Sequence, residues 1–348
     1  MNKIIFILIS AFAFFINSCD NNYNVTNEGE YKQIVEYFDT SNTKNIKRVY
    51  SGFVSETDTI IDGVYTEYYF NGALYCIINY VNGKKEGQYK FFHKNGVLKE
   101  IGVWKDDLAE GEIKNYHGNG ELKFSGKFIK GKKEGECSWF YENGLLIKRG
   151  FFINDLSEEN YKEYHPNGKL YFIGKYVKGK KEGECKWYHE NGHLSDIGFY
   201  INDLCEGDYK SYYPNGKLKF AGKLVKDKKE GECKWYYENG RVDREAVYHA
   251  GRIISAKQLS KEGGEKYIGT LKNGTGSLYY FYSNGIIKRI FVYENSRLLW
   301  VVNEQDESGR PRKLPSTLQN GNGNVYNYRK DGSVVDTVKY INGITYDK

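Results

Sequence analysis

The chain has 348 residues, with 51 Lys and Arg against 45 Asp and Glu and a net charge of +6. Hydrophobic residues make up 40% of it and aromatic residues 16%, and this composition excludes a wholly disordered chain. The positive surplus is small and alternates with negative charge, which excludes the basic stripe of a nucleic-acid-binding protein.

The start of the chain has the pattern of a secretory signal. Lys3 supplies one positive charge, Ile4–Ile16 is mostly apolar, and Asn17 and Ser18 precede Cys19. The apolar stretch is shorter than the ~20 residues that a membrane-spanning helix needs. The pattern therefore predicts export rather than a transmembrane helix.

Ile16-Asn17-Ser18-Cys19 resembles the lipobox of bacterial lipoproteins. The resemblance implies that residues 1–18 are cleaved and that Cys19 is lipidated, which would anchor the protein to a bacterial membrane, here the outer membrane. Asn17 departs from the small residue usual at its position, so secretion without an anchor stays an alternative. Residues 19–45 would then be the lipidated cysteine and a polar tether, with local order near Tyr31–Phe38.

Asn-Gly recurs at a constant interval through the middle of the chain, and each period is called a module below. The pairs begin at Asn71, Asn95, Asn119, Asn143, Asn167, Asn191, Asn215 and Asn239. In each module an aromatic residue lies three residues before the Asn and Leu or Val three residues after it, as Phe92 and Leu98 do. An Asn-Gly turn makes these two positions face each other across a β-hairpin. Pro166 and Pro214 before the Asn favour a three-residue loop with a left-handed Gly.

Strict alternation along these strands makes a second set of predictions. Lys90 should face Glu100, and Lys186 should face Asp196. The glycines seven residues after each Asn and the aromatic residues nine residues after it should lie on the same face as the aromatic–aliphatic pair.

The modules predict an all-β fold, an elongated single-layer antiparallel sheet of tandem β-hairpins of ~24 residues each. Residues 46–250 hold eight regular repeats and residues 251–348 hold degenerate ones. The later series continues at Asn284, Ser308 and Asp331. The cross-strand pair is repeated by Phe281 with Ile287 and by Tyr328 with Val334, but it is missing around Gly263 and Ser308.

One module shows the full motif, with Gly183, Trp187, Tyr188, Asn191, Gly192, Leu194, Gly198 and Tyr200. This order resembles the MORN-repeat variant of bacterial proteins, including those called YwqK-family antitoxins, over residues 46 to 346. Glu159 and Ala246 depart from it, because they stand where other modules have glycine. The resemblance implies the hairpin-repeat fold and, where the antitoxin name applies, a secreted toxin as partner.

A second period, two modules long, is visible in the match of residues 131–178 with 179–226, which agree at 32 of 48 positions. Connections with Lys132 and Lys133 alternate with connections that carry Asp155. Such alternation is either a recognition stripe or an attraction between neighbouring modules. The sequence favours the attraction, because alternating charges cancel beyond a Debye length of ~8 Å.

Tryptophans occupy every second module four residues before the Asn, with aromatic residues beside them two residues before it. The candidate partner-binding residues are Trp139, Trp187, Trp235, Tyr141, His189 and Tyr237. They should lie on the face opposite the aromatic–aliphatic pairs. Two interpretations stay open, a docking surface for a protein or a glycan polymer, or packing against neighbouring modules of a curved sheet.

Residues that usually carry chemistry recur in register here. Cysteines 137, 185 and 233 stand two modules apart from one another, too far for disulfides, and with Cys76 and Cys205 they should be small buried hydrophobic residues. His93, His117, His165 and His189 share one position in different modules, so a common metal site is not expected. The repeated glutamates at 134 and 136 are interpreted as a solvated strand start. No enzyme, metal or cofactor is predicted.

The sequence thus predicts a non-enzymatic, envelope-anchored repeat scaffold that presents an extended surface to a protein partner. One alternative is an antitoxin or immunity-type protein that neutralises a toxin. Another is a glycan- or cell-wall-binding hairpin-repeat module, because Gly231–Tyr236 resembles repeats that grip choline or sugar. A third is an enzyme within the irregular stretch Arg252–Gly323.

Overall fold

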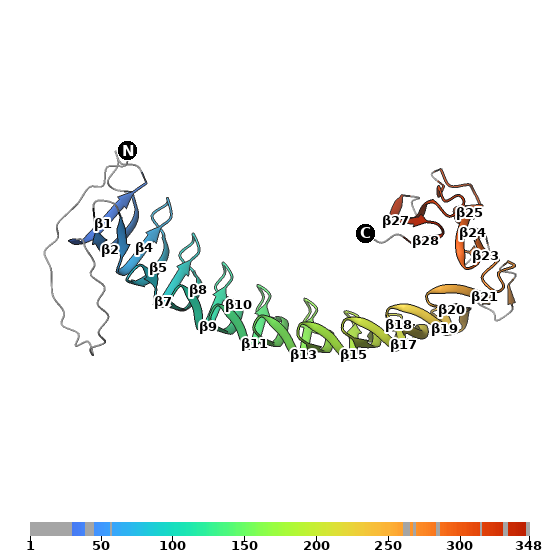
Figure 1. Cartoon of the computed structure of the whole chain (residues 1–348), viewed down its shortest axis with the longest axis horizontal. Helices are drawn as coiled ribbons and strands as arrows, with labels where there is room; N and C mark the ends of the chain where they lie inside the picture. Colours follow the sequence, from blue (N-terminus) through green and yellow to red (C-terminus); the bar gives the residue numbers. More distant parts are fainter. Residues whose placement is uncertain are drawn as a thin grey trace. The chain divides into compact units, whose positions relative to one another are not determined.

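The computed structural model describes residues 30–38, 45–55, 58–259, 265–266, 269–282, 286–313, 315–329 and 333–345. Every helix or strand in these ranges is a β-strand, and the pairings are antiparallel (Figure 1). The predicted all-β antiparallel fold of hairpin repeats is therefore confirmed. The predicted signal and Cys19 lie outside the described residues.

The chain divides into two compact units, the first ending at Leu170 but including Tyr176–Gly179, the second including Tyr171–Lys175 and running on from Lys180. The strands of the first unit are β1 (Glu30–Tyr37), β2 (Ile46–Val54), β3 (Thr59–Ile61), β4 (Gly63–Tyr68), β5 (Leu74–Val81), β6 (Lys84–Lys85), β7 (Gly87–Phe92), β8 (Leu98–Lys105), β9 (Leu108–Tyr116), β10 (Leu122–Ile129), β11 (Lys132–Phe140), β12 (Leu146–Ile153) and β13 (Leu156–Tyr164). β14 (Leu170–Val177) is divided between the units. The first unit is an open antiparallel sheet whose strands follow one another in chain order (Figure 1).

The second unit continues the hairpin pattern. Its strands are β15 (Lys180–Tyr188), β16 (Leu194–Ile201), β17 (Leu204–Tyr212), β18 (Leu218–Val225), β19 (Lys228–Tyr236), β20 (Val242–His249), β21 (Arg252–Leu259), β22 (Glu265–Lys266), β23 (Gly276–Phe281), β24 (Ile287–Glu294), β25 (Arg297–Val302), β26 (Gly323–Tyr328), β27 (Val334–Ile341) and β28 (Ile344–Thr345). β23 to β25 and β26 to β28 form two separate three-stranded sheets.

The sheet begins earlier than predicted, inside the segment assigned to the tether. β1 pairs with β2 from Glu30 to Tyr37. Ile34 is only 2% exposed and the ring of Tyr31 contacts Phe53 at 5.2 Å, so the segment buries apolar surface and is held as a strand. The local order expected near Tyr31–Phe38 is therefore a strand of the sheet.

The Asn-Gly turns have the predicted three-residue loop. In the module of Asn95, His93 N–H donates to the Val97 carbonyl at 2.8 Å and Gly96 N–H donates to the His93 carbonyl at 2.9 Å. Gly96 has φ +84°, in the left-handed region that glycine adopts without strain. The Asn95 side chain accepts the Val97 N–H at 3.1 Å, which fixes the loop further.

A β-bulge directly after each turn overturns the second set of register predictions. Phe92 pairs with Leu98 as predicted, but Phe91 then pairs with Glu100 and Lys90 with Ile101. Lys186 likewise pairs with Ile197 rather than Asp196. One extra residue on the strand after the turn shifts the pairing by one, and side chains beyond it change face.

The bulge places the core on the side that carries the tryptophans. The Trp139 ring contacts Phe124 at 5.0 Å and Phe152 at 5.6 Å. Cys137 is fully buried, and a Cβ on Gly126 would lie 2.6 Å from its sulfur. We call this side the core face and the side that carries Phe140 the outer face. The glycines and aromatic residues after the bulge thus lie on the core face, opposite to the prediction.

The hairpin ends away from the Asn-Gly turns are two-residue turns with both residues left-handed, such as Asn154 (φ +50°) and Asp155 (φ +69°). A left-handed glycine follows in the next strand, as at Gly135 and Gly183. Glu159 occupies this glycine position with φ +56°. A left-handed residue with a side chain costs ~1–2 kcal/mol, so this module is strained.

The later modules keep the hairpin register. Phe281 pairs with Ile287, and Tyr328 pairs with Val334, as predicted. Gln305 and Pro311 also form a bridge although they lack the aromatic–aliphatic chemistry. In the expected degenerate module around Gly263, residues 260–264 lie outside the described residues, and Gln258 pairs with Lys266 on the strands that flank them.

No helix among the residues that the structure describes is long and apolar enough to cross a membrane.

Candidate functional site

The three candidate tryptophans are half-buried on the core face, each between two rings. Trp187 contacts Phe172 at 4.9 Å and Tyr200 at 5.6 Å. Trp235 contacts Phe220 at 5.0 Å and Tyr248 at 6.2 Å. These contacts correspond to the second interpretation left open by the sequence, in which the tryptophans pack against neighbouring modules.

Cations cover part of the tryptophan surface that the rings leave open. The Lys148 ammonium lies 4.8 Å from the centre of the Trp139 ring, and the Arg244 guanidinium lies 4.0 Å from that of Trp235. Each cation comes from the strand paired with its tryptophan. Cation–π contacts of this kind stabilise by about 0.5–2 kcal/mol and hold the rings in place.

The row two residues before each Asn ties successive modules together. Tyr141 donates its hydroxyl proton to the Tyr164 carbonyl at 3.3 Å, and His189 Nε2 lies 2.9 Å from the Tyr212 carbonyl. A carbonyl oxygen only accepts, so His189 Nε2 carries a proton and acts as the tyrosine hydroxyl does. Tyr237, the sixth candidate, is half-buried at the same position of its module.

Because a histidine Nε2–H and a tyrosine hydroxyl can donate the same bond, histidine recurs two residues before the Asn of several modules. His93 and His117 bond the carbonyls of Tyr116 and Phe140, each at 2.9 Å and each 23 residues along the chain. Within the described part of the chain, no group of three or more His, Cys, Asp or Glu residues is placed to hold a metal ion.

The charged connections attract one another along the other edge. Lys133 Nζ lies 2.9 Å from Asp155 Oδ1, which also accepts the Lys133 backbone N–H at 3.0 Å. Donation by that N–H and by the Lys133 ammonium lowers the pKa of Asp155. In an earlier module Lys84 Nζ lies 3.0 Å from Asp106 Oδ1, and the Lys85 backbone N–H donates to Asp107 Oδ1 at 2.9 Å. These contacts agree with the attraction between modules that the sequence favoured.

The repeated glutamates have a structural task that the sequence reasoning missed. Glu134 accepts the N–H of Asn154 at 3.1 Å, and Glu182 accepts that of Asn202 at 3.1 Å. Each thus caps the two-residue turn 20 residues further on. The constant spacing between glutamate and turn was the available signal.

A backbone bond at these turns continues into the later modules. Asp155 N–H donates to the Lys133 carbonyl of the preceding connection at 3.1 Å. Ser296 N–H donates to Gly274 at 2.7 Å and Gly343 N–H donates to Gly321 at 2.8 Å, with the same offset along the chain. The modules after residue 251 therefore stack by the same bond as the regular ones.

The five described cysteines, at 76, 137, 185, 205 and 233, are buried and free, as predicted. Burial raises the pKa of Cys185 and of Cys205 to about 11, which keeps both thiols protonated and unreactive near neutral pH.

The outer face carries a row of exposed apolar side chains that the sequence reasoning did not find. The residues eight after every second Asn are Val103, Phe151, Phe199 and Val247, with exposed fractions of 39%, 38%, 49% and 37%. Lys127, Lys175 and Lys223 hold the same position in the modules between, and all three are exposed. The two-module period was the available signal for this row.

A cavity of about 440 Å³ lies beside Phe199, lined also by Glu184, Ile197, Asp208 and Lys210. Lys186 pairs with Glu184 at 2.5 Å. The exposed ring thus has a concave neighbourhood and a rim of both charges.

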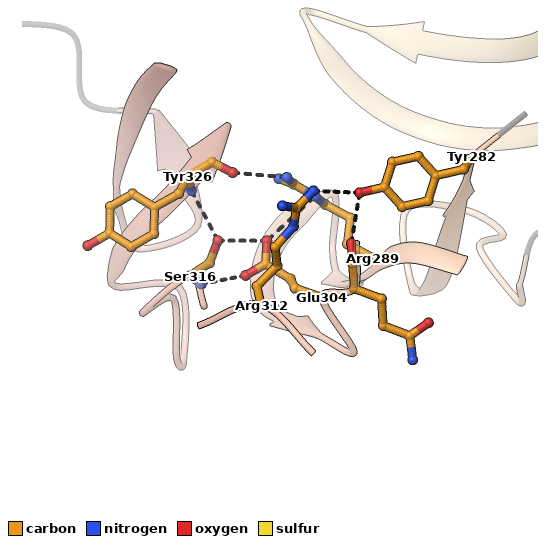
Figure 2. Close-up of polar contacts among 7 residues, drawn as sticks. Tyr282, Arg289, Glu304, Arg312, Ser316 and Tyr326 are labelled. Atoms are coloured by element: carbon orange, nitrogen blue, oxygen red, sulfur yellow. Dashed lines mark hydrogen bonds and ion pairs between the residues drawn. The ribbon is translucent and has the colours of Figure 1, made fainter. Parts of the chain in front are cut away.

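A second, different cluster lies among the later modules (Figure 2). Arg289 and Glu304 are 5% and 8% exposed and form an ion pair at 3.5 Å. Arg289 Nη2 donates to the Tyr326 carbonyl at 2.9 Å, and Ser316 donates its hydroxyl to Glu304 at 3.0 Å and its backbone N–H to the other carboxylate oxygen. Arg312 Nη2 donates to the Tyr282 hydroxyl at 2.8 Å.

Comparison with known proteins agrees with the repeat geometry. The family described as MORN repeat variant matches residues 61–82, 85–106, 133–154, 160–178, 181–202, 206–223 and 229–250. No curated protein matches the chain.

Two solved structures are similar in part. The crystal structure of TcdB2-TccC3-Cdc42 is 11% identical over 89% of this chain and 18% of that chain, with a TM-score of 0.15. The structure of the Photorhabdus luminescens Tc holotoxin pore is also 11% identical, over 89% of this chain and 18% of that chain, with a TM-score of 0.15. The chain spans less than a fifth of each of them.

Proposed function

Because seven segments of the chain match the MORN-repeat variant, we propose that the protein is a non-enzymatic repeat scaffold at the bacterial envelope. In this proposal it binds a protein partner on its outer face. One observation carries the proposal. Val103 and Phe151 in the first unit, and Phe199 and Val247 in the second, are large apolar side chains left exposed at a fixed period.

The two faces of the sheet differ in what they leave for a partner. On the core face the rings of Phe124, Trp139 and Phe152 already cover one another. On the outer face Phe199 is 49% exposed beside a cavity. Full burial of a Phe side chain stabilises by ~1.5–3 kcal/mol, so covering a half-exposed ring would contribute about half of that. A rim of mixed charge around an apolar centre is the usual anatomy of a protein interface.

A second surface is the core-face row of half-buried candidate residues, Trp139, Trp187, Trp235, Tyr141, His189 and Tyr237. A glycan would use this row, because the C–H groups of sugar rings pack against the faces of aromatic rings. The two faces therefore make opposite predictions for mutants.

The binding test replaces Phe151 and Phe199 by Lys together. Lys175 and Lys223 hold this position in neighbouring modules, so the sheet tolerates lysine there. A chain that carries a photoreactive residue at position 199 and is otherwise unchanged should cross-link to one defined envelope protein. That protein is then the partner whose affinity is measured.

The Phe151→Lys/Phe199→Lys protein should lose at least about tenfold of the partner's affinity for the purified chain. The matched control, Lys175→Ala, should bind as the parent does. Unchanged affinity in the double variant would remove the outer face from the proposal. Binding of purified cell-wall polysaccharide that is lost in Trp187→Phe would favour the glycan alternative instead.

The envelope address rests on Cys19 and needs its own test. Cells that express the full chain should incorporate labelled palmitate into it, and the chain should fractionate with membranes. The Cys19→Ser protein should lose both properties. A parent chain that is exported without label would support secretion without an anchor.

A further inference from the structure

A cavity of about 360 Å³ opens among the later modules, next to the cluster of Figure 2. Its lining includes Tyr282, Lys288, Arg310, Arg312, Tyr328 and Arg329. Lys288 and Arg312 hold the same position in successive modules, the residue after Ile287 and after Pro311. The hairpin register therefore brings their side chains to one site.

The lining has more positive than negative charge. Its cations are Lys288, Arg310, Arg312 and Arg329, and its carboxylates are Asp306 and Glu307. Asp306 is engaged by Arg310 at 2.9 Å and by the backbone N–H groups of Ser308 and Arg310. These contacts lower the pKa of Asp306, so this carboxylate is ionised and neutralises Arg310.

Lys288 and Arg312 have no such neutralisation. Among the residues that the structure describes, neither side chain forms an ion pair. The Lys288 ammonium lies 5.7 Å from the centre of the Tyr282 ring, and the Arg312 guanidinium lies 4.6 Å from that of Tyr328. Both cations thus rest on aromatic faces with donors left over.

The guanidinium of Arg312 is held before any ligand arrives. The Tyr282 hydroxyl accepts from Arg312 Nη2 at 2.8 Å and donates to the Gln305 carbonyl at 2.8 Å (Figure 2). Arg312 N–H also bonds the Glu304 carbonyl at 3.0 Å. A donor fixed in this way loses little freedom on binding, which favours affinity.

The site is electrostatically incomplete without an anion. Burial, and the positive charges of Arg289 and Arg312, lower the pKa of Lys288. The charges of Glu307 and Glu304 act in the opposite direction but less strongly, and Glu304 is already engaged by Arg289 and Ser316. An entering anion would reduce the repulsion between the cations, and it would do so in a partly desolvated place where charge interactions are strong.

We propose that this cavity binds a phosphate monoester group, with Lys288 and Arg312 as its direct ligands. The lining carries two more cations than carboxylates, which matches the charge of about −1.5 to −2 on such a group near neutral pH. The planar fork of arginine suits phosphate oxygens, and the tyrosine rings would lie against the organic part. Among the residues that the structure describes, Lys288 and Arg312 line a single cavity of this kind, whereas the outer-face row is repeated, so phosphate binding is a separate function from partner binding.

The test titrates the full chain with inorganic phosphate at constant ionic strength and follows the amide and lysine Nζ resonances. The parent should show saturable shifts confined to residues near Lys288 and Arg312, and the pKa of Lys288 should rise on binding. Lys288→Met should weaken phosphate binding at least tenfold. Arg312→Lys should also weaken it, because the fork is lost while the charge is kept.

The matched control is Lys219→Met. Lys219 holds the same position in a regular module and lies 5.8 Å from the Tyr213 ring, but it is exposed. This variant should bind phosphate as the parent does. Lys288→Met removes a partly buried charge and should fold at least as well as the parent, which a thermal melt checks. Shifts equal to those caused by chloride, a Lys288→Met protein that binds normally, or a preference for succinate would each overturn the assignment.

Discussion

The regular modules and the modules after residue 269 share a backbone but differ in what fills it. Phe220 pairs with Trp235 on the core face of a regular module. Arg289 and Glu304 have the same separation along the chain in the later modules and form a buried ion pair in place of the ring contact. The backbone bonds between successive two-residue turns continue through both regions. The backbone hydrogen bonds between successive turns therefore maintain the repeat, and the core positions can carry either aromatic or charged residues.

The largest effect should come from breaking the later region's buried pair. Glu304→Gln keeps an acceptor for Ser316 but leaves the Arg289 charge uncompensated, which should cost about 3 kcal/mol of local stability. Adding Arg289→Met should recover most of that loss. Hydrogen exchange of β24 and β25 amides measures both. An equal loss in the single and double variants would mean that the charge pair is not the cause.

The stability of the regular region should be more sensitive to added side-chain volume in its core. A Cβ on Gly222 would lie 2.6 Å from the Cys233 sulfur, so Gly222→Ala should destabilise the unit by about 2 kcal/mol. Cys233→Ala alone leaves a small void, and in combination it should offset much of the Gly222→Ala loss. Urea unfolding of the four proteins forms the cycle. Additive losses would contradict the close contact.

A strained module offers a gain within the regular region. Glu159 is left-handed at the position where Gly135 and Gly183 have the same conformation. Glu159→Gly should stabilise the first unit by about 1 kcal/mol, as judged by its urea midpoint. The reverse change, Gly183→Ala, should lower stability. No change in either protein would argue against left-handed strain at this position.

The smallest effect should be a difference in pH response between the two regions. Asp155 has a lowered pKa in the folded chain, so its stabilising contribution is complete above the unfolded value of ~3.9 and is lost as pH falls through the folded value. As pH falls through that value, protection of the Lys133 amide from hydrogen exchange should decrease in the parent by at most about fivefold more than it does in the Asp155→Asn protein. The turn at Ser296 has no carboxylate in the same place and should not respond. An equal response at both turns would remove Asp155 as the cause.

The repeat itself could be predicted because turn chemistry is local. Asn-Gly with its left-handed glycine, and the pair Phe92 with Leu98, follow from the residues alone. The bulge could not be predicted in this way, since its extra residue is Lys99 in one module and Ser195 in another, and it leaves the repeat length unchanged.

That one omission decided what was missed about the sites. It left the packing of Trp187 undecided and assigned the glycines and aromatic residues that follow the bulge to the wrong face. The cluster around Lys288 and Arg312 was missed because the module position that they share carries an exposed lysine, Lys219, in a regular module. Only the register of the folded chain brings those residues into one place.

The bonds that join regular modules reach only 20 to 23 residues along the chain, as between Glu134 and Asn154 or His117 and Phe140. A polypeptide with such low contact order needs no distant segment before it can fold. Each hairpin can pair with the edge strand of the hairpin before it. The chain can therefore fold module by module as it emerges from a ribosome or a translocation pore. Vectorial growth of this kind leaves little unpaired edge waiting at any moment.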